Sequence, residues 1–137
     1  MQVQSYRDLE AWQLGMGFVV RVYGVTKDFP REELFGLTSQ LRRAAVAIPS
    51  NISEGHQQGT KAYLHFVVMA LGSLAEAETQ LELARRLRFG DESEMAAPWP
   101  ISLYMCAKSL TDCVGHLRNA LTWGSETGVR GSSAVDP

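Results

Sequence analysis

The chain has 137 residues, and its 13 lysine and arginine residues nearly balance its 15 acidic residues, which gives a formal net charge of −2 at pH 7. This length provides one hydrophobic core but not two, so we expect a single domain. The near-neutral charge gives no general attraction to nucleic acid or to an anionic membrane, so any such binding must come from a local patch.

The first predicted helix covers about residues 6–27 and ends before a helix-breaking Asp-Phe-Pro sequence. Ser5 or Asp8 is expected to cap its start. Phe18 and Val20 fall outside its heptad stripe, which indicates either a thick core or a second surface for a partner. The stripe itself repeats every three or four residues and is expected to face the core; its members are Leu9, Trp12, Met16, Val19 and Tyr23.

A second helix is predicted over about residues 32–54, after a short loop. Because short loops join antiparallel neighbours, we expect the first two helices to form a hairpin. The apolar residues of the second helix recur every three or four positions, which places them on one side. This buried seam consists of Leu37, Leu41, Ala44, Ala45, Ile48 and Ile52.

Polar side chains form a second stripe on the same helix, interrupted by Ala47. A solvated face more commonly carries Lys and Glu, whereas this stripe combines amides, a guanidinium and a carboxylate. We interpret it as a hydrogen-bonded contact with another helix or another subunit, and the alternative is a solvated face. Its members are Gln40, Arg43, Asn51 and Glu54.

Pro49 lies within this helical pattern. It has no N–H, and its ring presses on the carbonyl of Ala45, so a continuous helix should kink there. Ser50 and Asn51 are expected to satisfy the loosened backbone groups through their side chains. The alternative is that the helix ends near Ile48 and a new turn begins with the proline.

The third helix is predicted over about residues 61–88, after a loop at residues 55–59. Its heptad consists of Tyr63, Val67, Ala70, Leu74, Ala77, Leu81 and Ala84. A second apolar stripe makes the apolar arc too wide for a simple surface helix, and it either thickens the core or forms a subunit contact. This second stripe consists of Leu64, Val68, Leu71 and Ala75.

The third helix also carries a polar stripe of Ser73, Glu76 and Gln80. If the second and third helices are neighbours, this stripe is the natural partner of the polar stripe on the second helix, with Arg43 paired to Glu76. Gly72 is unfavourable in a helix interior, which suggests a close approach of another backbone.

Arginines gather at the C-terminal end of the third helix, where the helix dipole favours cations. Arg85, Arg86 and Arg88 therefore either cap this helix or form a phosphate-binding patch.

A fourth helix is predicted over about residues 99–123, after a loose connection at residues 91–100. Its seam includes Cys106 and Cys113, which are separated by about 10 Å of helical rise and so cannot form a disulfide. Residues 125–137 are rich in Gly and Ser without periodicity and are expected to be disordered.

The sequence contains no recognisable catalytic or metal-binding motif. A di-iron bundle needs inward-facing Glu-x-x-His pairs, which are missing, as are a glycine-rich phosphate loop and a nucleophile motif. We expect no enzyme activity, no metal and no cofactor. No window approaches about 18 uninterrupted apolar residues and no signal peptide is evident, so a cytoplasmic protein without membrane association is expected.

Two segments carry a family resemblance: FPREELFGLTSQLRRAAVAIPSNISEG at residues 29–55 and GSLAEAETQLELA at residues 72–84. They resemble the four-helix bundle protein family, which includes the proteins encoded in intervening sequences of 23S ribosomal RNA genes and is related to the accessory variability determinants of diversity-generating retroelements. The resemblance covers about residues 6–122. It implies an all-α, antiparallel up-and-down four-helix bundle over residues 1–124, a five-fold homo-oligomer, nucleic-acid binding among relatives and no known catalysis.

The chain departs from the family pattern at two places. Relatives usually carry Ser at the position of Ala47, and a basic residue shortly after the Glu-Gly pair, where this chain has Gln57 and Gln58. The second departure removes positive charge from a region suited to phosphate contact.

Two functions are therefore considered. In the first, an oligomer contacts RNA or DNA phosphates without reading sequence, through Arg42, Arg43, Lys61, Arg85, Arg86 and Arg88. In the second, the chain is a structural or adaptor oligomer that binds a protein partner, and the same arginines make salt bridges between subunits or to that partner. Replacing Arg42 and Arg43 with alanine separates them, because it weakens nucleic-acid binding in the first case and assembly in the second.

Overall fold

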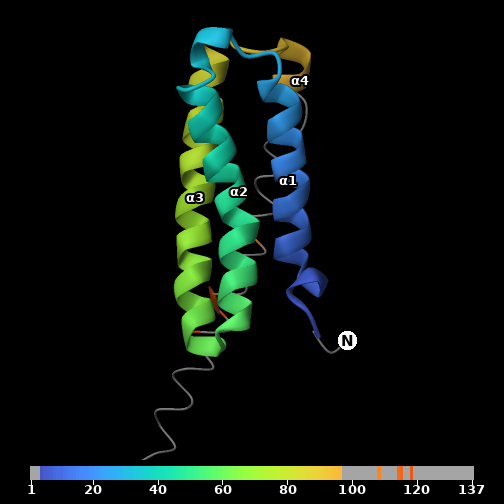
Figure 1. Cartoon of the computed structure of the whole chain (residues 1–137), viewed down its shortest axis with the longest axis vertical. Helices are drawn as coiled ribbons and strands as arrows, with labels where there is room; N and C mark the ends of the chain where they lie inside the picture. Colours follow the sequence, from blue (N-terminus) through green and yellow to red (C-terminus); the bar gives the residue numbers. More distant parts are fainter. Residues whose placement is uncertain (1–3, 97–107, 109–113, 116–117, 119–137) are drawn as a thin grey trace, which may run out of the picture.

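A computed structural model describes residues 4–96, 108, 114–115 and 118. These residues form helices and turns without a strand, which confirms the predicted all-α class for the described part of the chain. Three long helices lie side by side along the long axis and alternate in direction, with α2 between α1 and α3 (Figure 1). The elements are η1 (Tyr6–Asp8), α1 (Glu10–Thr26), η2 (Arg31–Glu33), α2 (Leu37–Gln57), α3 (Thr60–Arg86) and α4 (Glu92–Ala96).

The first predicted helix is divided in the structure. Leu9 is extended, with φ −73° and ψ 125°, and it separates the 3-10 turn η1 from α1. Ser5 caps η1 by accepting a hydrogen bond from the Arg7 amide at 3.3 Å, and the Asp8 carboxylate accepts from the Ser5 amide at 3.0 Å. The predicted capping residues are thus confirmed, but they cap a short turn rather than the long helix.

The predicted stripe of the first helix is confirmed only in part as a buried face, because Leu9, Trp12 and Val19 pack against the core but its other two members do not. Met16 and Tyr23 are 40% and 43% exposed, whereas Phe18, predicted outside the stripe, is buried at 2%. A Cβ added to Gly15 would lie 3.4 Å from Ile48, so α1 turns its small residues toward α2. The buried face consists of Ala11, Gly15, Phe18, Val22, Val25 and Thr26.

The predicted seam of α2 is confirmed, because all six of its apolar residues are buried. The helix boundaries differ from the prediction at both ends: residues 31–33 form the separate turn η2, and α2 continues to Gln57. Leu37 donates its amide to the Glu33 carboxylate at 2.9 Å, so η2 caps the start of α2 from outside. Gly55, predicted to lie in a loop, is buried inside the helix.

The helix α2 continues through Pro49 rather than ending before it. The two side chains that follow the proline bond to carbonyls one turn earlier, but these are not the Ala45 carbonyl that the proline leaves without its donor. Ser50 donates its hydroxyl to the Val46 carbonyl at 2.7 Å, and the Asn51 amide donates to the Ala47 carbonyl at 2.8 Å. The proline is itself buried in the contact with α1, which offsets the loss of one backbone hydrogen bond.

The heptad of α3 is confirmed, since all seven of its members are buried. Its second apolar stripe is split: Leu64 and Leu71 pack against the core, whereas Val68 is 48% exposed. A Cβ added to Gly72 would meet nothing within 4 Å. The predicted close approach of a backbone at Gly72 is therefore wrong within the described part of the chain.

The C-terminal end of α3 forms a Schellman motif. Phe89 donates its amide to the Ala84 carbonyl at 2.9 Å, and Arg88 donates to the Arg85 carbonyl at 3.0 Å. Arg88 occupies the left-handed position of this motif, with φ 58°, where glycine is usual. A side chain at this conformation strains the backbone.

Replacing Arg88 with glycine is expected to raise the free energy of unfolding by about 1 kcal/mol, because glycine adopts positive φ without steric cost. Urea denaturation followed by circular dichroism measures the change. Arg88→Ala is the matched control, because it removes the same side chain but keeps the strain. Equal stability of the two variants would contradict this explanation.

A short helix, α4, lies within the connection expected at residues 91–100. Asp91 caps it by accepting hydrogen bonds from the Ser93 hydroxyl and from the Ser93 and Glu94 amides. The Ser93 hydroxyl has the largest part in lowering the pKa of Asp91 below its ordinary value. Met95 is buried at 5%, which anchors this short helix to the core.

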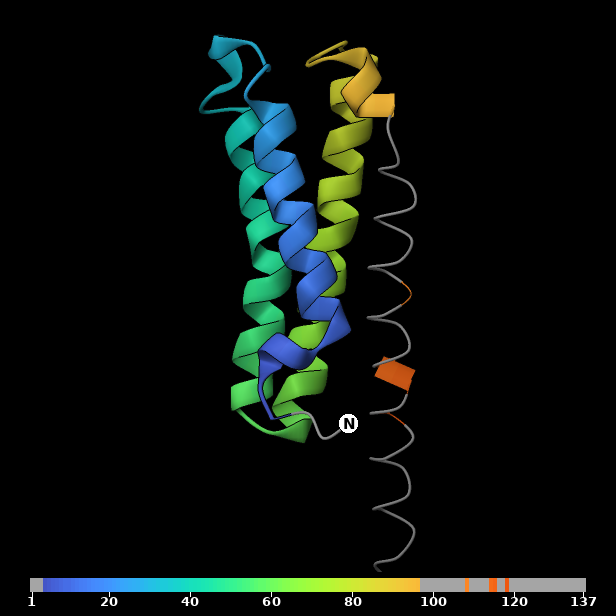
Figure 2. The ribbon, with the colours of Figure 1, turned by 90° about the vertical axis from the view of Figure 1, so that its right-hand side faces the viewer.

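Most of the predicted fourth helix, residues 99–123, lies outside the described residues, as do Cys106, Cys113 and the predicted tail at 125–137. The four described residues within that span, Lys108, Val114, Gly115 and Arg118, are helical. In the view turned by 90°, α1 crosses in front of α2 and α3 (Figure 2). None of the described helices is long and apolar enough to cross a membrane.

Candidate functional site

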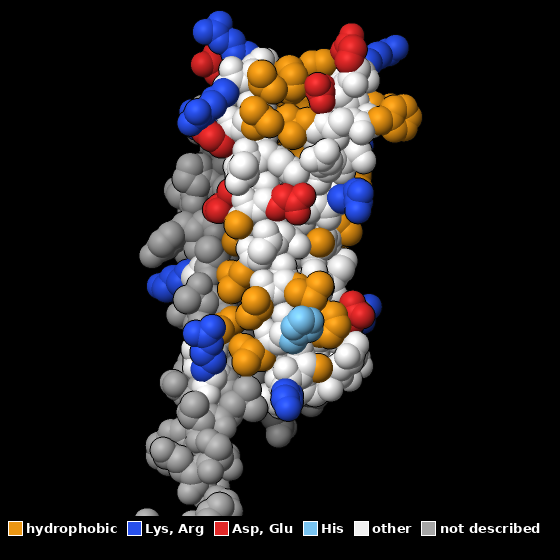
Figure 3. All heavy atoms as spheres, turned by 90° about the vertical axis from the view of Figure 1, so that its left-hand side faces the viewer, with side chains coloured by type: hydrophobic (Ala, Val, Ile, Leu, Met, Phe, Trp, Pro, Cys, Tyr) orange, Lys and Arg blue, Asp and Glu red, His pale blue; other side chains and the backbone are white. Residues whose placement is uncertain are grey.

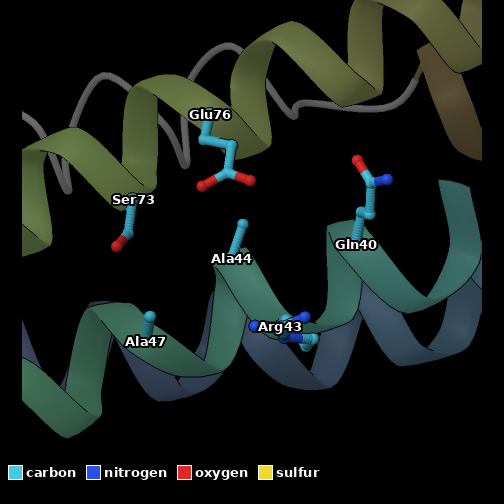
Figure 4. Close-up of a pocket in the computed structure, with 6 residues that line it drawn as sticks. All are labelled: Gln40, Arg43, Ala44, Ala47, Ser73 and Glu76. Carbon is cyan, nitrogen blue, oxygen red and sulfur yellow. The ribbon is translucent and has the colours of Figure 1, made fainter.

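The polar stripes of α2 and α3 face each other across a slot of about 330 Å³ (Figure 4). Gln40 points from α2 into this slot, and Ser73 and Glu76 point into it from α3. The slot exists because Ala44 and Ala47 are too small to fill the space between the helices. The remaining members of the predicted stripe lie elsewhere: Asn51 bonds within its own helix, and Glu54 is exposed.

The expected pairing of Arg43 with Glu76 is absent from the described part of the chain. Arg43 lines the slot from α2 but makes no ion pair with Glu76 in the part of the chain that the structure describes (Figure 4). Glu76 instead accepts a hydrogen bond from the Gln80 side-chain amide at 3.2 Å. Gln80 is 8% exposed, and its Oε1 has no hydrogen-bond partner. The polar groups of α2 and α3 that line the slot therefore face each other without an ion pair between the two helices.

Arg42 joins α2 to α1 instead of projecting freely. Its Nε donates to the Thr26 hydroxyl at 2.8 Å, and that hydroxyl donates in turn to the Val22 carbonyl at 2.7 Å. The Arg42 guanidinium also lies 4.5 Å from the centroid of the Tyr23 ring. The structure thus gives this arginine a role inside the hairpin, which competes with binding a phosphate.

Two other candidate arginines are held by one carboxylate. Arg85 and Arg86 lie 3.0 Å and 2.9 Å from the oxygens of Glu82, one turn earlier on α3. The hydrogen bond from Arg86 lowers the pKa of Glu82, and the charge of Arg85 adds to this effect. These exposed pairs contribute little to stability, but they fix both guanidinium groups beside the helix end.

The candidate cations do not form one continuous patch on the described surface. Lys61 lies at the start of α3, and Arg85 and Arg86 lie at its opposite end. Figure 3 shows Lys and Arg side chains dispersed along the edges of the visible face, with acidic side chains between them. Arg88 lines a hollow of about 500 Å³ that also holds the carboxylates of Glu82 and Glu92.

A larger hollow lies between α1, α2 and the turn that joins them, and we call it the α1–α2 groove. It encloses about 680 Å³. Several of its apolar side chains are exposed: Phe35 by 93%, Leu34 by 52% and Tyr23 by 43%. Its lining residues are Tyr23, Leu34, Phe35, Thr38, Ser39, Arg42, Arg43, Val46 and Ala47. Sequence analysis missed this surface, and the signal available was an apolar Leu-Phe pair directly before Gly36 in a turn.

Comparison with known proteins connects this architecture to a family. The family model described as 23S rRNA-intervening sequence protein matches residues 7–98. The chain belongs to the 23S rRNA-intervening sequence protein family. The match covers α1, α2 and α3, and therefore the slot and the α1–α2 groove.

A solved structure supports the fold of this intervening-sequence protein. It is a protein of unknown function from the S23 ribosomal protein family of Bacteroides thetaiotaomicron, with a TM-score of 0.55 and 21% sequence identity. The similarity covers 80% of this chain and 96% of that chain. A search among curated proteins finds no match.

Proposed function

We propose that this 23S rRNA-intervening sequence protein is a non-catalytic protein that acts as a homo-oligomer, and that its assembly is a structural or adaptor scaffold. The observation that carries the proposal is the α1–α2 groove. Its large apolar side chains stay exposed although the three long helices bury well-filled seams. Contiguous exposed apolar surface of this kind marks sites of protein association.

The number of subunits follows from the family resemblance, which implies five. A five-fold ring uses head-to-tail contacts, in which each copy presents one surface to the preceding subunit and a different surface to the next. The groove and the apolar turn at its edge share Leu34 and Phe35 and form one continuous apolar surface, of which the turn and the hollow would each contact a different neighbour in such a ring.

A second candidate function is binding to the phosphate backbone of RNA or DNA. Three candidate cations, Arg43, Arg88 and Lys61, are exposed, and no ion pair to them is seen among the described residues. A homo-oligomer would repeat them around its axis and concentrate their charge. Contacts of this kind depend on salt, because binding releases counterions from the nucleic acid.

One experiment separates the two functions. Light scattering coupled to size exclusion gives the mass of the purified protein over a range of concentrations, and we expect a multiple of the subunit mass. A salt titration with duplex RNA then measures nucleic-acid binding by the wild type and by Lys61→Ala plus Arg88→Ala, two exposed cations outside the α1–α2 groove. Lys27→Ala plus Arg7→Ala, which removes two exposed charges elsewhere, is the control.

If the purified protein is a monomer at every concentration, the proposed scaffold function is wrong. If it is an oligomer that binds no RNA even at low salt, the scaffold function stands and the RNA-binding function is wrong. Equal loss of RNA binding in both double variants would show that general charge, and not Lys61 and Arg88, is responsible.

A further inference from the structure

We infer that the turn between α1 and α2 of one copy docks into the α1–α2 groove of a second copy, with Phe35 as its anchor. This inference rests on the proposed homo-oligomer and assigns the residues of its contact. We call residues 31–36 the corner. The corner and the groove together give the subunit an apolar projection and an apolar receptor.

The corner is a rigid support for Phe35. Backbone hydrogen bonds close it at both ends: the Leu34 amide donates to the Arg31 carbonyl at 3.2 Å, and the Gly36 amide donates to the Glu33 carbonyl at 3.0 Å. A Cβ on Gly36 would lie 2.6 Å from the Glu33 carboxylate oxygen that caps α2. A turn fixed in this way loses little conformational entropy when it docks.

Phe35 is not buried by its own subunit. It lines the edge of the groove, yet 93% of it remains exposed. A large aromatic ring held outward by a rigid turn is an unusual feature of an isolated monomer, and such rings are typical anchors of protein interfaces. Its burial therefore needs the surface of another molecule.

The groove is preformed to receive an aromatic ring. The bond from Arg42 to Thr26 fixes the guanidinium over Tyr23, so this wall is held in place without a ligand. Val46, 39% exposed, lines the groove from α2. On α1, Met16 and Val20 continue the apolar strip beyond Tyr23, because their spacings of four and three place them on one face.

Charge complementarity favours a second copy as the occupant. The corner contains one arginine and two glutamates, a net charge of −1, and Glu32 on it is exposed. The groove carries Arg42 and Arg43, so its rim is positive. An acidic corner with an apolar tip thus matches a basic groove with apolar walls, and one chain supplies both halves.

The anchor is tested by light scattering of the intact chain carrying Phe35→Ser. We expect self-association to weaken by roughly 10- to 100-fold, the effect of leaving one aromatic side chain unburied at each contact. Val68→Ser is the matched control, because Val68 is also exposed but lies on α3. Circular dichroism should show both variants folded, since neither side chain is in the core.

Charge reversal tests the partner. Glu32→Arg and Arg43→Glu should each weaken assembly, and the double variant should recover it, because the two changed residues meet across the contact between copies. A wild-type monomer would remove the proposed function together with this inference. A wild-type oligomer whose mass is unchanged by Phe35→Ser, or a double variant weaker than either single variant, would overturn the inference alone.

Discussion

Replacing Phe18 with alanine is expected to lower the free energy of unfolding by about 3–5 kcal/mol. Phe18 is 2% exposed and is among the largest fully buried side chains of the described core. Its removal takes an aromatic ring out of the core and leaves a cavity that the surrounding helices can only partly close. Urea denaturation at one fixed protein concentration measures the loss, since assembly would add a concentration-dependent contribution.

Met16→Ala is the control that makes this result informative. Met16 belongs to the stripe that the sequence predicts as buried, but it is 40% exposed, so its replacement should change the free energy of unfolding by less than about 1 kcal/mol. A larger loss for Met16→Ala than for Phe18→Ala would show that α1 packs through the stripe predicted from its sequence. In that case α1 would be rotated about its own axis relative to its orientation in the structure.

The buried face of α2 was predictable because its sequence contains one dominant stripe, and that of α3 because its heptad continues without interruption through seven positions beside a shorter second stripe. The corresponding residues of α1 are apolar nearly all round, so two interleaved stripes compete and periodicity alone does not choose between them. The choice depends on the partner: Gly15 allows α1 to lie against Ile48 and Pro49. That fit is a property of two helices together.

One feature of the candidate site was predictable from the sequence, and two others were not. The meeting of the polar stripes at Gln40, Ser73 and Glu76 followed from helical spacing, because both stripes lie beside seams that pack together. The bond from Arg42 to Thr26 joins residues 16 positions apart on different helices, which no local pattern predicts. The α1–α2 groove also needs two helices and a turn to be assembled before it exists.

The ion pairs of Glu82 are an example of a signal that was present but not used. Arg85 and Arg86 follow it by three and four residues, the spacings at which side chains on a helix meet. A local count of charges would therefore have indicated that both arginines already have a partner. Both arginines remain exposed, so a phosphate would have to compete with the Glu82 carboxylate for them.

Replacing Gly55 with alanine is expected to lower the free energy of unfolding by about 1–3 kcal/mol, although alanine is the better helix former. A Cβ at Gly55 would lie 2.6 Å from the Phe66 Cβ and 3.1 Å from the Tyr63 Cα. These atoms belong to or lie next to the backbone of α3, so the two helices must move apart at this end. Thermal or urea denaturation measures the change.

The same substitution at Gly72 is expected to have the opposite sign. Outside its own helical turn, no atom of the described residues lies within 4 Å of a Cβ at Gly72, so Gly72→Ala should stabilise the chain by about 0.5–1 kcal/mol through backbone entropy alone. A gain at Gly55 would mean that residues 55–59 form the loop predicted from the sequence and that α2 ends before them. A loss at Gly72 would mean that another backbone, such as that of a second copy, packs against α3 there.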